Sequence, residues 1–168
     1  MKEELLGMAN AVRSAVSRVP FQERGRTVAM GADGTPTSFI DRVAEDAILQ
    51  FMDENGVPAN ILSEEAGFIE RGFGSTLVAD PVDGTHNACA GIPFYSVSLA
   101  LGRDSLAGIT EGLVMNLANG DVFHAEKGKG ASFNGQALKV SGPGDDLLLM
   151  AYLGASALPR TYAVANRF

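Results

Sequence analysis

The stretch Thr76-Leu-Val-Ala-Asp80-Pro-Val-Asp83-Gly-Thr85-His-Asn87 joins an apolar run to a polar turn. Residues 76–79 predict a β-strand with Asp80 at its end. Side chains alternate along a strand, and the proline-containing turn after Asp80 reverses the direction of the chain. Asp83 should therefore lie near Asp80. Gly84-Thr85 then opens a turn or short helix, whose free N–H groups can bind an anion. Two carboxylates beside such groups favour a site for Mg²⁺ and phosphate.

An alternative interpretation of this stretch is purely conformational. Asp-Pro and Asp-Gly are common turn formers, and either dipeptide alone predicts no more than a turn. The five fixed positions together would arise by chance on the order of once per million windows at typical amino-acid frequencies. The combination therefore favours a functional site over a stretch that only forms a turn.

Two other acidic positions are candidates for the same site. Glu64 and Glu65 follow the apolar pair Ile61-Leu62, again at the end of an expected strand. Taken alone, that pair is equally consistent with a polar turn. Asp41 lies on the first turn of an expected helix, where a carboxylate can also serve only as a cap or dipole partner.

The rest of the chain predicts an α+β fold, with two helices packed on a largely antiparallel sheet. Helical spacing of apolar residues indicates helices over residues 3–19 and about 38–55, separated by a Gly-rich loop over 30–37. Short β-prone runs bounded by turn residues follow. We expect strands at 60–63, 75–80, 95–101, 107–116, 120–124, 131–133 and 147–153.

The amino-acid composition argues against several classes of function. The 168 residues are 46% hydrophobic and carry a net charge of −7, which argues against nucleic-acid or membrane-surface binding. One cysteine, Cys89, excludes an internal disulfide, and two histidines, His86 and His124, make a His-rich metal site improbable. The N-terminus lacks the apolar segment of a signal peptide, so we expect a cytoplasmic protein.

These motifs resemble the inositol monophosphatase superfamily of Mg²⁺-dependent, lithium-sensitive sugar phosphatases. The family signature is a Glu-Glu pair followed by Asp-Pro-(Ile/Leu/Val)-Asp-Gly-Thr-x-Asn, and this chain has Glu64-Glu65 and Asp80–Asn87. The loop over 31–37 resembles the archaeal branch, in which inositol monophosphatase and fructose-1,6-bisphosphatase activities coexist. The resemblance covers residues 5–153 and implies the N-terminal layer of an αβαβα sandwich.

The resemblance also implies roles for individual residues. Glu64, Asp80, the Val82 carbonyl and Asp83 match metal ligands. Asp83, Gly84 and Thr85 match the phosphate-binding turn. Asp41 and Thr85 match the pair that orients and deprotonates the attacking water, Glu65 is an additional catalytic or third-metal carboxylate, and His86 is a candidate substrate contact or an exposed loop residue.

The resemblance further implies two or three Mg²⁺ ions, replaceable by Mn²⁺ and inhibited by Li⁺. Expected substrates are small sugar or polyol phosphates, and the expected assembly is a homodimer. Family members continue into a C-terminal αβ domain with a Trp-Asp motif, and this sequence contains no Trp. We therefore interpret residues 1–168 as an N-terminal metal- and phosphate-binding domain. Alternatives are a catalytically incomplete member that binds metal weakly and a relative acting on nucleotide 3′-phosphates.

Overall fold

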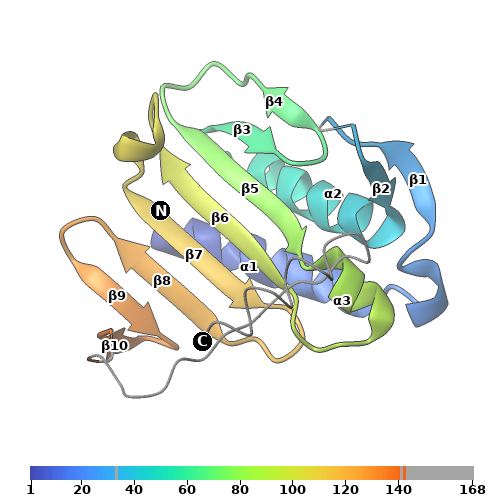
Figure 1. Cartoon of the computed structure of the whole chain (residues 1–168). Coiled ribbons are helices and arrows are strands. Elements are labelled where there is room, and N and C mark those ends of the chain that lie inside the picture. Colours follow the sequence, from blue (N-terminus) through green and yellow to red (C-terminus); the bar gives the residue numbers. More distant parts are fainter. Residues whose placement is uncertain (33, 141, 143–168) are drawn as a thin grey trace, which may run out of the picture. The chain divides into compact units, whose positions relative to one another are not determined.

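Two amphipathic helices form one layer of the molecule. A computed structural model describes residues 1–32, 34–140 and 142, and residues 1–138 form one compact unit. Helix α1 (Lys2–Ser17) and helix α2 (Phe39–Glu54) pack against each other through their apolar stripes. Both helices lie behind the sheet in Figure 1. The two helices expected from the sequence are therefore confirmed, with their ends moved by one to two residues.

The second layer is an eight-stranded sheet in the order β10-β9-β8-β7-β6-β5-β3-β4. All neighbouring strands are antiparallel except β3 and β5, which are parallel. The α+β class and the largely antiparallel sheet are thus confirmed. The strands of the sheet are β3 (Asn60–Ser63), β4 (Gly67–Ile69), β5 (Thr76–Asp83), β6 (Ser96–Gly102), β7 (Glu111–Asn116), β8 (Val122–Glu126), β9 (Gly130–Phe133) and β10 (Gln136–Leu138).

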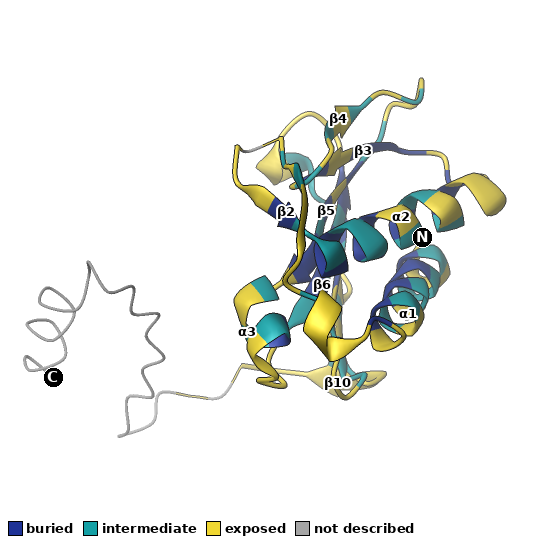
Figure 2. Ribbon diagram, turned by 90° about the vertical axis from the view of Figure 1, so that its right-hand side faces the viewer, coloured by how far each residue is buried: buried dark blue, intermediate teal, exposed yellow. Residues whose placement is uncertain are grey.

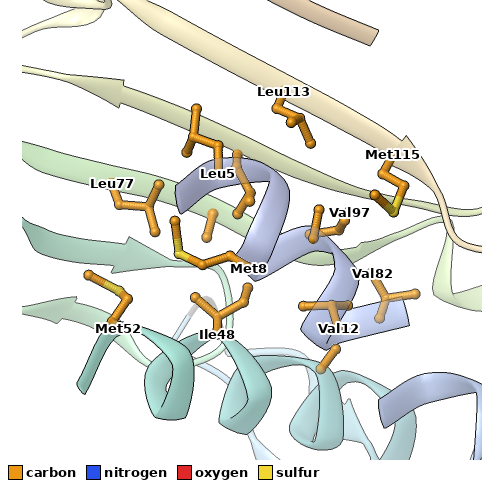
Figure 3. Packing of buried hydrophobic residues seen from close by; sticks show 14 of the residues in the cluster. Leu5, Met8, Val12, Ile48, Met52, Leu77, Val82, Val97, Leu113 and Met115 are labelled. Atoms are coloured by element: carbon orange, nitrogen blue, oxygen red, sulfur yellow. The ribbon is translucent and has the colours of Figure 1, made fainter. Parts of the chain in front are cut away.

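The hydrophobic core lies between the helices and the sheet. Alternate residues of the central strands point toward the helices, as the period of two along a strand requires. Figure 3 shows this packing: Leu5 and Met8 of α1 and Ile48 of α2 meet Leu77 and Val97 of the sheet. In Figure 2 the fully buried residues gather on the sides where the helices and strands face each other. This core holds the end of β5 and the start of α2 in fixed positions.

Several local elements differ from the sequence-based expectations. The expected strand over 107–116 begins only at Glu111, because Leu106–Gly108 form a 3₁₀ turn. The expected loop over 30–37 is shorter than predicted, because Met30 ends strand β1 (Thr27–Met30) and Pro36 begins strand β2 (Pro36–Ser38), and these two strands pair as an antiparallel hairpin. A short 3₁₀ turn (Phe21–Glu23), β4 and β10 were not expected. The strand expected over 147–153 lies outside the described residues.

The face of the sheet away from the helices is open in the described part of the chain. It carries an apolar depression of about 860 Å³ on the central strands, with Glu64 and Asp80 among its lining residues. Exposed side chains on this face include Leu62, Val78, Val114 and Phe123. None of the described helices combines the length and the hydropathy that crossing a membrane requires.

Candidate metal and phosphate site

The acidic motif occupies an irregular end of strand β5. Asp80 is paired with Ser98 of β6 and Asp83 with Ser96, so three steps along β5 match two along β6. This extra residue is a bulge, and Pro81 within it cannot donate a ladder hydrogen bond. The strand therefore continues to Asp83 rather than ending at Asp80 as expected. Asp83 lies near enough to Asp80 for its charge to act on the Asp80 carboxyl group.

Helix α2 brings Asp41 to the same place. Ser38 is the N-cap of this helix, and its N–H and hydroxyl donate to Asp41 Oδ2 at 3.2 and 2.6 Å. The Asp41 N–H in turn donates to the Ser38 side chain, and this reciprocal pair of backbone-to-side-chain bonds is a capping box, which fixes the first turn of the helix. The carboxylate of Asp41 is only 5% exposed, so its orientation is set by these bonds. Its other oxygen, Oδ1, remains available to a second partner.

That partner is Thr85, the first residue of the short helix α3 (Thr85–Ala90). Its hydroxyl oxygen lies 2.8 Å from Asp41 Oδ1 and 2.9 Å from the Val82 carbonyl oxygen. A hydroxyl has one proton and two lone pairs, so Thr85 donates to one of these oxygens at a time, or shares its proton between them, and can still accept a hydrogen bond from a third group. Three predicted site residues from separate elements are therefore joined by hydrogen bonds.

The turn after β3 holds the Glu-Glu pair. The hydroxyl of Thr37, on β2, donates a hydrogen bond to the Glu65 carboxylate. Burial raises the pKa of Glu65, and this hydrogen bond works in the opposite direction. The N–H of Ala32, in the β1–β2 loop, donates to the Glu65 carbonyl at 2.9 Å. The hairpin over residues 27–38 thus braces the turn that carries Glu64 and Glu65.

A buried carboxylate that the sequence analysis missed supports the same turn. Glu45 of α2 is completely buried, and its Oε1 accepts hydrogen bonds from the Ser63 hydroxyl at 2.6 Å and the Ala66 N–H at 2.9 Å. Arg42 approaches its other oxygen at 3.4 Å. Glu45 lies four residues after Asp41, and this i, i+4 spacing on one helical face could have identified it.

Negative charge is concentrated at Asp80. Burial, followed by the charges of Glu64 and Asp83, raises the pKa of Asp80 to about 7. The charge of Asp41 acts in the same direction. Among the described residues, no group donates a hydrogen bond to the buried Oδ1 of Asp80. An unpartnered oxygen amid other carboxylates is well suited to a hard cation, which binds oxygen ligands.

This carboxyl group makes the stability of the metal-free chain depend on pH. The folded chain retains the Asp80 proton up to its pKa of about 7, whereas the unfolded chain loses it near the ordinary pKa of an aspartic acid, about 3.8. The free energy of unfolding should therefore fall as pH rises through this window and level off above it. We expect urea unfolding in EDTA to show this slope, and Asp80→Asn to flatten it. Parallel profiles for the two proteins would contradict the assignment.

Gly84 makes the sharp change of direction between the motif and α3. Its φ is +90°, and a Cβ at this position would lie 3.1 Å from the Phe94 carbonyl oxygen. We expect Gly84→Ala to lower the free energy of unfolding by about 2 kcal/mol, through φ strain plus this contact. Gly72→Ala is the matched control, since Gly72 has φ +81° and open space around it. Equal losses in chemical denaturation would show that the contact is harmless.

His86 and the other residues that could carry chemistry have more ordinary surroundings. His86 is exposed on α3, as a substrate contact or a loop residue would be. Cys89 is half-buried, and burial raises its pKa, which disfavours the reactive thiolate. His124 is paired with the buried Glu111 at 2.8 Å, in agreement with a structural role. Residues 127–129 form the turn between β8 and β9.

The donor set at the end of β5 consists of carboxylates and backbone carbonyls. Glu64 and Asp83 both act electrostatically on Asp80, although in the described part of the chain no three acidic, His or Cys side chains already have metal-binding geometry. Oxygen ligands of this kind fit Mg²⁺ or Mn²⁺ rather than a thiolate-bound metal. The unpartnered oxygen and raised pKa of Asp80 agree with that fit.

Several known proteins are similar to this chain in sequence or in fold. Fructose-1,6-bisphosphatase/inositol-1-monophosphatase of Archaeoglobus fulgidus is 46% identical over 136 residues, covering 80% of this chain and 52% of that protein. A bifunctional NADP phosphatase/NAD kinase of Methanococcus maripaludis is 38% identical over 151 residues, covering 79% and 26%. The solved structure of extragenic suppressor protein suhB from Bartonella henselae has a TM-score of 0.71 and 29% identity, covering 84% of this chain and 55% of that one.

The match covers most of this chain but only part of each relative. This chain spans about half the length of the archaeal fructose-1,6-bisphosphatase/inositol-1-monophosphatase relatives. The model of the inositol monophosphatase family matches residues 2–164, nearly the whole chain. With the signature residues gathered at one end of the sheet, the chain belongs to the inositol monophosphatase family.

Proposed function

We propose that this chain carries the metal- and phosphate-binding part of a phosphoric monoester hydrolase that acts on small sugar or polyol phosphates. The observation that carries the proposal is the hydrogen-bonded group of Asp41, Thr85 and the Val82 carbonyl. Beside it lies Asp80, whose raised pKa reflects burial among other carboxylates and favours binding of a cation. The names of the archaeal relatives favour fructose-1,6-bisphosphate and inositol-1-phosphate as substrates.

The proposed metal ligands are Glu64, Asp80, the Val82 carbonyl and Asp83, with Mg²⁺ as the metal and Mn²⁺ as a substitute. When bound, such cations neutralise phosphate charge and lower the pKa of a coordinated water. Their positive charge is essential here, because the metal-free site would repel an anionic substrate. We expect two or three Mg²⁺ per complete site, with Glu65 near a third, and inhibition by Li⁺.

Asp41 and Thr85 are proposed to prepare the attacking water. Asp41 accepts a hydrogen bond from the Thr85 hydroxyl through Oδ1, so a lone pair of that hydroxyl is free to accept a hydrogen bond from the attacking water. Asp41 is held for this task because Ser38 fixes its other oxygen. A water so oriented is aligned for attack on phosphorus, which is the positional part of general base catalysis.

The substrate phosphate is proposed to bind at the turn formed by Gly84 and Thr85. Asp83 would take part in phosphate binding by holding a metal ion next to it. Backbone N–H groups at such a turn favour an anion. His86, exposed on the same helix, is a candidate contact for the rest of the substrate. We expect the protein to work in the cytoplasm as a homodimer.

The test is release of inorganic phosphate from inositol-1-phosphate and from fructose-1,6-bisphosphate by the purified chain, with Mg²⁺ and with Mg²⁺ plus Li⁺. We expect Mg²⁺-dependent release that Li⁺ suppresses. Thr85→Val should abolish it because the hydroxyl is lost, whereas Thr85→Ser should retain most of it. Mg²⁺ binding without any phosphate release would instead support a chain that binds metal but is catalytically incomplete.

A second candidate substrate comes from another relative. The Methanococcus maripaludis relative is named as an NADP phosphatase, and it is 38% identical to this chain. NADP, and nucleotide 3′-phosphates as the related alternative, therefore belong in the same phosphate-release assay. Faster turnover of either than of both sugar phosphates would transfer the proposal to nucleotides.

The open apolar face of the sheet also predicts self-association. Patches of this kind commonly mark interfaces. We expect multi-angle light scattering to give a mass above the 17.6 kDa of one chain. A monomer at high protein concentration would contradict the expected dimer.

A further inference from the structure

A second pocket, far less apolar than the sheet depression, lies beside the C-terminal half of α1. Its volume is about 430 Å³, and none of its lining residues is Asp or Glu. This pocket is separate from the predicted metal site, since neither Asp80 nor Glu64 lines it. The polar side chains that line it are Asn10, Arg13, Ser14, Ser17, Arg24 and Tyr95.

Arg24 is held in place from three sides. Its Nη1 donates to the Ala88 carbonyl oxygen of α3 at 3.1 Å. Its guanidinium carbon lies 5.7 Å from the centre of the Phe21 ring and 5.9 Å from that of Tyr95, within the range of cation–π attraction. Within the described residues, nothing accepts a hydrogen bond from its buried Nε. One carbonyl thus uses only one of the five N–H donors of this side chain.

Arg13 is fixed in a similar way on the other side of the pocket. Its Nε donates to the Leu117 carbonyl oxygen at 3.4 Å. The guanidinium packs against Gly120, where an added Cβ would lie 2.9 Å from Arg13 Cζ. Gly120 has a φ of +85°, which favours glycine, and the absence of a side chain there leaves space for the guanidinium. The hydrogen bond to Leu117 and this packing favour one arrangement of Arg13, which lowers the conformational cost of binding a ligand.

The charge of the pocket is opposite to that of the chain. The whole sequence has a net charge of −7, yet two arginines and no carboxylate line this pocket. The ion pairs of the described residues use other basic groups, among them Arg26, Arg42 and Arg71. Planar guanidinium groups with free N–H donors match the oxygens of a phosphate better than any neutral ligand.

We propose that this pocket is a second phosphate-binding site, which takes inorganic phosphate or the phosphate group of a small metabolite without a metal ion. Arg13 and Arg24 would supply the charge, and the hydroxyls of Ser14 and Tyr95 lie on the same lining to complete the donor set. The site needs no divalent cation, which separates it from the end of β5.

The test is a calorimetric titration of the chain with inorganic phosphate in EDTA. Without cations the carboxylates at Asp80 repel phosphate, so saturable binding reports this pocket. We expect one phosphate per chain, with Arg13→Gln weakening it at least about 10-fold because a charge-assisted hydrogen bond is lost. Arg18→Gln, which removes an exposed charge from the end of the same helix, should change it less than about 2-fold.

The outcomes are distinct from those of the phosphatase assay, which depends on metal. No saturable binding, or equal weakening by Arg13→Gln and Arg18→Gln, would overturn the second site while leaving the proposed activity intact. Arg24→Gln is a further variant whose folding is checked by circular dichroism, and Arg13→Gln alone decides the question if it unfolds. A parallel titration with glycerol phosphate distinguishes the source: tighter binding than inorganic phosphate assigns the pocket to phosphate esters.

Discussion

Asp80→Asn should make the metal-free chain more stable and remove its response to divalent cations. Its carboxyl group has a pKa of about 7 because it is buried beside Glu64 and Asp83. At pH 8 the wild-type chain therefore keeps a disfavoured charge in the folded state, which the amide removes. Allowing for solvent screening of this partly exposed group, we expect a gain of about 2 kcal/mol in EDTA.

The same substitution removes a proposed metal ligand. Changes to groups that merely support a ligand cost about 10–100-fold in metal affinity or activity, so loss of the ligand itself should cost more than about 100-fold. Thermal unfolding with and without Mn²⁺ measures both effects on one sample. Asp46→Asn is the control, because Asp46 is an exposed carboxylate of α2. A destabilised Asp80→Asn chain that still responds to Mn²⁺ would remove Asp80 from the site.

Glu45→Ala should cost more stability than any other single carboxylate substitution proposed for this chain. Glu45 is fully buried and accepts hydrogen bonds from Ser63 and Ala66. Its removal leaves these donors and the nearby Arg42 without a buried acceptor, a loss worth about 3 kcal/mol. Because Ser63 and Ala66 flank Glu64 and Glu65, the acidic turn should lose its position as well.

Urea denaturation measures the stability, and Mn²⁺ titration of the folded fraction measures the second effect. Glu54→Ala, on the exposed end of the same helix, should change stability by less than about 0.5 kcal/mol. Glu45→Gln should recover part of the loss, since its amide oxygen can still accept from Ser63. If Glu45→Ala were as stable as Glu54→Ala, the buried carboxylate would have no structural importance.

Local patterns predicted much of the architecture. Helical spacing defined α1 and α2 to within about two residues. β3 was predicted with the correct bounds. The motif after residue 79 was correctly placed at a strand end, but the bulge that carries the strand on to Asp83 was not foreseen. A bulge depends on the register of the neighbouring strand, which no local pattern contains.

The parts of the site that escaped prediction depend on tertiary contacts. Thr37 and Glu45 contact the Glu64–Glu65 turn from β2 and α2, 28 and 18 residues away in the chain from their partners. A loop was predicted over residues 30–37 because this stretch is short and rich in Gly, Thr and Pro. Asp41 and Thr85 were paired through family resemblance, and their hydrogen bond supplies the physical basis for that pairing.

Mn²⁺ titration at pH 8, followed by the electron paramagnetic resonance signal of free Mn²⁺, tests the central claim most directly. The account predicts saturable disappearance of the free-ion signal in the wild-type chain and in Asp46→Asn, restored by excess Mg²⁺. The signal should persist in Asp80→Asn. Equal Mn²⁺ binding by Asp80→Asn and wild type, or no binding by wild type, would contradict a divalent-cation site at the end of β5.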